Sequence, residues 1–155
     1  AIAEGQVIIA RKCVGISDQC SNQEVREKNN GLINTVNNNY GYGFLVVVAY
    51  PLEGLPIGLV NHLLSIDPSA EFMVVVTAHY REIKVSEAQW VKRGTLLGYG
   101  GSTGNSSGPH LHFEVRISSK ILLELGAKCD QWSCPGIEGF QKLPHINPNI
   151  LLEWY

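Results

Sequence analysis

The sequence lacks a strong net charge of either sign. It has 12 Lys and Arg residues against 14 Asp and Glu residues, which gives a formal net charge of -2. A chain with so small an excess offers no broad basic surface for nucleic acid or for an anionic membrane. We therefore expect no nucleic-acid partner.

Long hydrophobic runs are absent as well. The longest apolar stretches fall far short of the ~20 residues that a transmembrane helix needs, and residues 1–10 lack the basic start of a signal peptide. The sequence predicts no membrane span. The first residue is Ala rather than Met, so we expect that the chain was processed or cut from a longer protein.

The length and the apolar pattern predict one mostly β domain. A chain of 155 residues is in the usual range for a single domain. Leucines at helical spacing predict a short helix over 56–66, inserted between strands. We predict a small antiparallel β-sheet or barrel-sandwich, with a hairpin over 91–98 and strands over 7–10, 44–49, 72–77 and 111–117.

Four cysteines form two close pairs, Cys13 with Cys20 and Cys129 with Cys134. In an exported protein this spacing suits two small-loop disulfides, whereas in a reducing compartment the same residues are free thiols. We favour disulfides. A zinc ribbon would have two residues between paired cysteines, and here six and four intervene, so a structural metal knot is not expected.

The most informative segment is 98–116, which reads GYGGSTGNSSGPHLHFEVR. Residues two apart on a strand share a face, so His110, His112 and Glu114 are expected on one face and Leu111, Phe113 and Val115 on the core face. Two imidazoles and a carboxylate in a row suit metal ligation or proton transfer. The alternative is a solvent-facing strand with two incidental histidines.

The glycine-rich loop before this strand does not have the spacing of a nucleotide-binding loop. We predict instead a tight loop with positive φ angles that presents its backbone to a ligand, with Pro109 at the entry to the strand. The loop glycines are Gly100, Gly101, Gly104 and Gly108. His79 ends the Val-rich strand at 72–77, a position that suits a cleft better than a core.

These motifs together resemble the lysostaphin and LytM type of zinc endopeptidases. The resemblance lies in TAHY at 77–80, VKRG at 91–94 and, above all, GSTGNSSGPHLHFEV at 101–115. It extends more loosely from residue 3 to residue 117, with 118–155 as a C-terminal extension of a single domain 1–155. It implies a small antiparallel β fold with a groove that cuts peptide bonds in bacterial peptidoglycan, in an extracytoplasmic location.

The resemblance also implies roles for individual residues. His112, the second histidine of His-x-His, would bind zinc, while His110 and His79 would polarise water or steady the tetrahedral intermediate. Glu114 would support the site as a hydrogen-bonding partner of a ligand. The loop before the strand contributes Gly104, Ser107, Gly108 and Pro109 to the signature.

The family's other two zinc ligands come from a His-x-x-x-Asp motif, which occurs nowhere in the 155 residues. We therefore expect weak or absent zinc binding and no activity in the isolated chain. Three explanations stay open. The ligands lie on a missing N-terminal segment or a partner chain, or the chain is a degenerate binding module for wall peptides or a protein partner, or it is a structural domain with leftover site residues.

Overall fold

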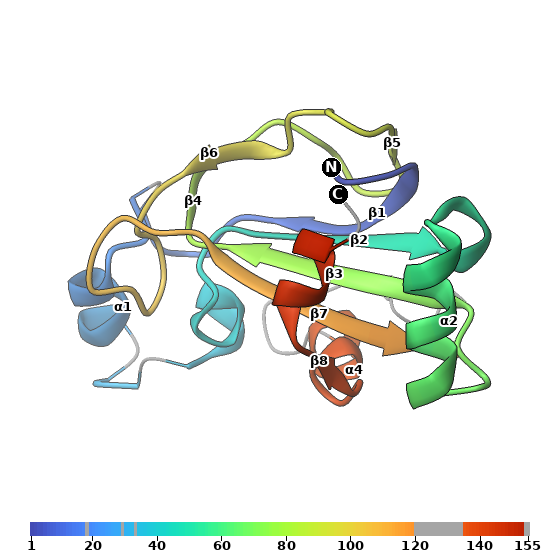
Figure 1. The fold of residues 1–155 in the computed structure, drawn as a ribbon. Coiled ribbons are helices and arrows are strands. Elements are labelled where there is room, and N and C mark those ends of the chain that lie inside the picture. The colour runs from blue at the N-terminus through green and yellow to red at the C-terminus, as the bar shows by residue number, and fades with distance from the viewer. Residues whose placement is uncertain (18, 29, 33, 120–134, 154–155) are drawn as a thin grey trace.

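The computed structural model describes residues 1–17, 19–28, 30–32, 34–119 and 135–153. Its centre is a six-stranded antiparallel sheet in the order β5-β1-β2-β3-β7-β8, and β4 and β6 form a second, two-stranded sheet (Figure 1). The strands are β1 (Gly5–Arg11), β2 (Leu45–Pro51), β3 (Phe72–Ala78), β4 (Tyr80–Ile83), β5 (Trp90–Val91), β6 (Gly98–Gly100), β7 (His112–Ser118) and β8 (His145–Ile146). The predicted mostly β fold is confirmed.

The two central strands are β2 and β3, which pair in register from Leu45↔Ala78 to Pro51↔Phe72. Both are rich in valine, whose branched side chain packs well on a pleated surface. Their residues are almost all buried because both faces of the sheet are covered. β7 pairs with β3 from Ala78↔His112 to Phe72↔Ser118, which places the His-x-His strand beside the end of β3.

Different elements cover the two faces of the sheet. Helix α2 (Ile57–Ile66) buries Leu59 and Leu63 on one face, in a core with Val48 and Val75. This helix confirms the prediction for 56–66. Helix α4 (Pro135–Gln141) lies against the other face, beneath β7 and β8 in Figure 1. It packs Ile137 and Phe140 against Val74 and Val76.

The remaining helical elements are short. They are α1 (Asn22–Lys28) and the 3-10 helices η1 (Val36–Gly41), η2 (Leu52–Gly54) and η3 (Pro148–Glu153). Within η1, Asn39 and Tyr40 have φ angles of 53° and 56° and Gly41 has 99°, so the chain turns sharply there. This turn brings Tyr42 to the end of β3, where its carbonyl accepts a hydrogen bond from the His79 N–H (3.0 Å).

Two sequence predictions about the fold are wrong in detail. The segment 91–98 is not a hairpin, because β5 pairs with β1 while β6 pairs with β4. Leu111 is 53% exposed rather than part of the core, because β7 begins only at His112. Within the predicted C-terminal extension, β8 adds a strand to the sheet beside β7.

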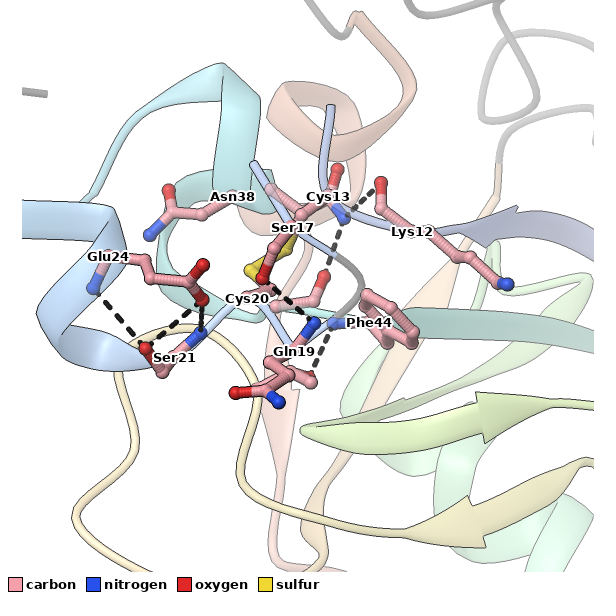
Figure 2. The surroundings of a disulfide bond; sticks show 12 residues. Lys12, Cys13, Ser17, Gln19, Cys20, Ser21, Glu24, Asn38 and Phe44 are labelled. Atoms are coloured by element: carbon pink, nitrogen blue, oxygen red, sulfur yellow. Dashed lines mark hydrogen bonds between the residues drawn. A yellow bond between two sulfur atoms is a disulfide. The ribbon is translucent and has the colours of Figure 1, made fainter. Parts of the chain in front are cut away.

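The predicted disulfide between Cys13 and Cys20 is in the structure, whereas Cys129 and Cys134 lie outside the described residues. It joins the chain after β1 to the turn before α1 (Figure 2). Cys20 is fully buried, and its carbonyl accepts a hydrogen bond from the Gly104 N–H (2.7 Å). The disulfide loop thus holds the glycine-rich loop through this hydrogen bond.

In the part of the chain that the structure describes, no helix combines the length and the apolar character that crossing a membrane requires.

Candidate active site

His79 follows β3 directly and is held in an uncommon conformation. Its φ angle is 63°, in the left-handed region that non-glycine residues rarely adopt. The side chain is buried, and Nδ1 lies 2.8 Å from the carbonyl oxygen of Thr103. Because a carbonyl can only accept, Nδ1 carries the proton and Nε2 keeps its lone pair. Burial is the main cause that lowers the pKa of His79 below its ordinary value, so the ring is neutral at pH 7.

The glycine-rich loop reaches His79 through Thr103. The Thr103 hydroxyl donates to the Tyr80 carbonyl (2.8 Å) and accepts from the Phe44 N–H (2.9 Å). These two bonds fix the loop to the starts of β4 and β2. Of the four loop glycines, only Gly104 has the predicted positive φ, at 75°. It is also pressed against Gly43, where a side chain on either residue would overlap backbone.

Gly101 is instead limited by packing, because an added Cβ would lie 2.5 Å from the backbone nitrogen of Arg81. No such contact limits Gly100 or Gly108. The prediction of positive φ angles was therefore right at one position and wrong at three.

His110 lies opposite Gly101 in an isolated antiparallel bridge, just before β7. Its Nδ1 is 2.8 Å from the carbonyl oxygen of Gly108, so this ring also carries its proton on Nδ1 and keeps a lone pair on Nε2. The Ser106 hydroxyl donates to the same carbonyl (2.8 Å). The His110 side chain is exposed, which leaves its free nitrogen accessible.

His112 is the first residue of β7, and Glu114 follows on the same face. His112 Nε2 lies 2.6 Å from Glu114 Oε1. The other carboxylate oxygen accepts from Arg116, at 2.8 Å from Nε and 2.6 Å from Nη2. An acceptor held by a guanidinium is a carboxylate, so His112 donates from Nε2 and keeps its lone pair on Nδ1. Nδ1 of His112, which is turned away from Glu114, is thus the nitrogen free to bind a ligand.

The surroundings of Glu114 favour its charged form. Burial opposes ionisation, but hydrogen bonds from His112 and Arg116 outweigh it and lower the pKa of Glu114 to about 2. The Tyr42 hydroxyl donates to Glu114 Oε1 (2.9 Å). Burial first, and then the Glu114 charge, raise the pKa of Tyr42 to about 12, so this hydroxyl stays protonated.

The three imidazoles converge at one place. The centroid of the His79 ring lies 4.7 Å from that of His110 and 5.5 Å from that of His112. A pocket of about 230 Å³ opens beside His79 and His112. Its remaining lining is mostly polar and comes from Asn34, Tyr40, Gly41, Tyr42, Asn105 and Gln141. The arrangement offers two imidazoles, those of His79 and His110, whose Nε2 atoms can accept a proton, next to amide groups that can hydrogen-bond a peptide.

The structure thus brings together His79, His110 and His112, with Glu114 behind His112. Ser107 and Pro109 are exposed. Neither His62 nor His145 is among the residues that line the pocket: His62 is exposed on α2, and His145, 3.6 Å from Glu114 Oε2, lies in β8.

Sequence reasoning missed the residues that fix these side chains. Tyr42, Thr103, Ser106 and Arg116 all bond to one of the histidines or to Glu114. Arg116 had a signal, because it follows Glu114 by two residues and so shares its face of the strand. The other three act through contacts that spacing alone does not reveal.

Comparison with known proteins finds matches to one family of peptidases. Residues 57–122 match the family model described as Peptidase family M23. A stretch of 42 residues is 45% identical to the peptidoglycan DD-endopeptidase ShyB of Vibrio cholerae, covering 27% of this chain and 10% of that protein. Lysostaphin of Staphylococcus simulans is 42% identical over 41 residues, 26% of this chain and 8% of that protein.

The DD-carboxypeptidase/endopeptidase Mpg of Neisseria meningitidis is 53% identical over 36 residues, 23% of this chain and 8% of that protein. The matched stretches span about a tenth of the length of these relatives. The resemblance of this chain to the lysostaphin type of M23 peptidases is thereby confirmed.

Solved structures of peptidases also align with this chain. The catalytic domain of lysostaphin from Staphylococcus simulans aligns with a TM-score of 0.44 at 22% identity, over 79% of this chain and 59% of that chain. A zinc-containing peptidase from Vibrio cholerae aligns with a TM-score of 0.42 at 24% identity, over 74% of this chain and 22% of that chain.

Peptidases of the M23 family depend on zinc, and a catalytic zinc takes three protein ligands and a water. The free Nδ1 of His112 suits a metal. Among the residues that the structure describes, however, no group of three His, Cys, Asp or Glu side chains is placed to hold an ion. These residues do not fit a complete zinc site, so no chemical step is assigned to zinc.

Proposed function

We propose that this chain carries the histidine part of a peptidase site that acts on peptide bonds of peptidoglycan, and that the isolated chain does not cleave them. The observation that carries the proposal is the convergence of three imidazoles whose hydrogen bonds each leave one named ring nitrogen free. The M23 match over 57–122 supports the reaction class.

His79 and His110 are the proposed catalytic residues. Each is held by a backbone carbonyl at Nδ1 and offers Nε2 as a base or as an acceptor for a peptide N–H. The exposed His110 would meet the substrate first, whereas the buried His79 is fixed by the loop. The polar pocket beside them would bind the peptide backbone through the side chains of Asn34, Asn105 and Gln141.

The proposed inactivity follows from the ligand set. His112 supplies one metal position, and the sequence holds no His-x-x-x-Asp to supply the others. One imidazole binds zinc far more weakly than three correctly placed donors. We propose that the remaining ligands come from another segment or a partner chain, and that residues 1–155 act as one domain outside the cytoplasm. The disulfide supports that location.

Zinc titration of the purified chain tests the ligand assignment. We expect weak, substoichiometric binding at micromolar zinc that disappears in His112→Ala. His62→Ala is the matched control, because it removes an exposed histidine distant from the pocket lining. Tight stoichiometric binding that survives His112→Ala would contradict the assignment.

Hydrolysis of purified peptidoglycan sacculi, followed by turbidity and by released amines, tests the inactivity. We expect no hydrolysis with or without added zinc. Zinc-dependent hydrolysis that is lost in His110→Ala would show that the chain is a complete enzyme.

The alternative function is a non-catalytic module that binds wall peptides. The amide-lined pocket favours it, because such a pocket can hold a peptide without a metal. Sacculus binding that does not change in His110→Ala, together with no metal binding, would favour this module over the peptidase site.

A further inference from the structure

Residues 136–143, here called the C-terminal wall, border the pocket although they lie outside the M23 match. Ile137 and Phe140 are fully buried. The Phe140 ring lies 5.8 Å from the Tyr42 ring, and Gln141 lines the pocket together with His79 and His112. The wall is therefore part of the site's surroundings and not a separate appendage.

A single buried side chain joins the wall to β7. Arg116 is only 3% exposed, and its Nη1 lies within hydrogen-bonding distance of three wall carbonyls. These distances are 3.0 Å to Phe140, 2.8 Å to Gln141 and 3.0 Å to Leu143. The last carbonyls of a helix lack partners within the helix, so a guanidinium there supplies a donor to them; the Phe140 carbonyl also accepts from the Leu143 N–H (3.0 Å).

The other edge of the same guanidinium faces the site. Its Nε and Nη2 bond to Glu114 Oε2, and Glu114 Oε1 accepts from His112 Nε2. The hydrogen bonds therefore run without interruption from the wall through Arg116 and Glu114 to His112. A planar guanidinium holds a carboxylate in one orientation, and the carboxylate in turn selects the imidazole nitrogen that carries the proton.

A second contact joins the wall to η1. The Tyr40 hydroxyl donates to Glu138 Oε1 at 2.5 Å. Tyr40 itself lines the pocket, and its neighbour Gly41 does too. The wall is thus held both at β7, through Arg116, and at η1, through Tyr40.

We infer that Arg116 is a positioning residue that couples the C-terminal wall to His112, keeping His112 Nδ1 free, while the wall contributes Gln141 to peptide binding. The peptide-binding half of this inference rests on the proposed function. The positioning half concerns the protein alone and is tested without any ligand.

The tautomer of His112 is the direct readout for positioning. Long-range ¹H–¹⁵N NMR on ¹⁵N-histidine-labelled protein at roughly pH 8, about 1.5 units above the ordinary histidine pKa, distinguishes the two neutral forms. We expect one form in the unmodified chain, with Nε2 protonated. Arg116→Lys keeps the charge but loses the planar guanidinium. In this variant we expect a mixture of both forms at His112 and an unchanged His79 signal.

A second variant covers the case in which Arg116→Lys does not fold. Glu114→Gln keeps the size of the side chain but removes the charged acceptor, and it should give the same mixture at His112. A single Nε2-protonated form in whichever of these variants is folded would overturn the coupling.

Sedimentation with purified peptidoglycan sacculi tests the wall. Gln141→Ala should lower the bound fraction, giving an apparent affinity several-fold weaker, with the His112 tautomer unchanged. Gln23→Ala is the matched control, because Gln23 is also an exposed helical glutamine and lies in α1.

The outcomes separate this inference from the proposed function. If the unmodified chain does not bind sacculi, the proposed function fails and so does the role of Gln141, while the tautomer experiment still decides the role of Arg116. If the chain binds and Gln141→Ala binds equally well, the wall has no part in recognition.

Discussion

Residues 57–122 and residues 136–151 both contribute to the surroundings of the site, yet they differ in how they can be recognised. The first region holds the M23 match, with His79, His110 and His112. The second has no recognisable motif and reaches the site through buried contacts with Arg116 and Tyr42. A motif can thus mark the histidines of a candidate site, while a segment that holds them in place lies outside it.

The largest expected effect is that of Arg116→Met, which removes the link between the two regions. It leaves the Glu114 carboxylate without its charged partner and removes the guanidinium donor from the carbonyls of Phe140, Gln141 and Leu143. Breaking a buried ion pair costs about 3–5 kcal/mol, and we expect the free energy of unfolding in urea to fall by at least about 4 kcal/mol. Arg81→Met, at an exposed arginine, should cost less than about 1 kcal/mol. Equal effects of the two substitutions would contradict the link.

Phe140→Ala tests whether the second region belongs to the same folding unit as the first. Removing a fully buried phenylalanine costs about 3 kcal/mol or more, as Leu63→Ala in α2 should. Both variants should lower the midpoint of a single urea transition. If Phe140→Ala leaves that midpoint unchanged, the wall unfolds separately and does not support the site.

The disulfide also supports the first region, because the carbonyl of Cys20 accepts a hydrogen bond from the Gly104 N–H. Replacing Cys13 and Cys20 together by Ser removes a bridge between residues seven apart, which by loop entropy stabilises the fold by about 2.5 kcal/mol. We expect this loss in thermal unfolding, with retained β structure by circular dichroism. A reducing agent should lower the stability of the unmodified protein in the same way. Unmodified protein that is as stable after reduction as before would be inconsistent with a stabilising bridge.

The smallest effect is expected for Tyr40→Phe, which removes one hydrogen bond between η1 and the wall. The bond is partly buried and has a carboxylate acceptor, so we expect a loss of about 1 kcal/mol in urea. Tyr99→Phe, at an exposed tyrosine, should change the unfolding free energy by less than about 0.5 kcal/mol. If the two variants are equally stable, Tyr40 does not hold the wall.

The strands and the histidines were predictable because their signals are local. The Val-rich runs of β2 and β3 indicate buried sheet wherever they fall, and residues two apart on β7 must share a face. The placement of His112 and Glu114 together follows from that alternation. The family resemblance then pointed to His79, which spacing alone would not have joined to them.

The helix α4 was not predictable from its own residues. Its sequence PGIEGFQ has two glycines and only seven residues, so helix propensity is poor and no apolar period can be read. It forms because Ile137 and Phe140 are buried on the sheet and because Arg116 satisfies its last carbonyls. Such contacts join residues more than twenty positions apart, beyond the reach of spacing arguments.

The most direct test of the account is the binding of two histidine variants to purified peptidoglycan sacculi, measured by sedimentation against the unmodified chain. His110 and His62 are both exposed, and only His110 lies beside His79 in the site. The account predicts that His110→Ala binds about tenfold more weakly, a loss of ~1.4 kcal/mol, and that His62→Ala binds normally. Equal binding by both variants would contradict the claim that the three histidines form a site for peptidoglycan peptides.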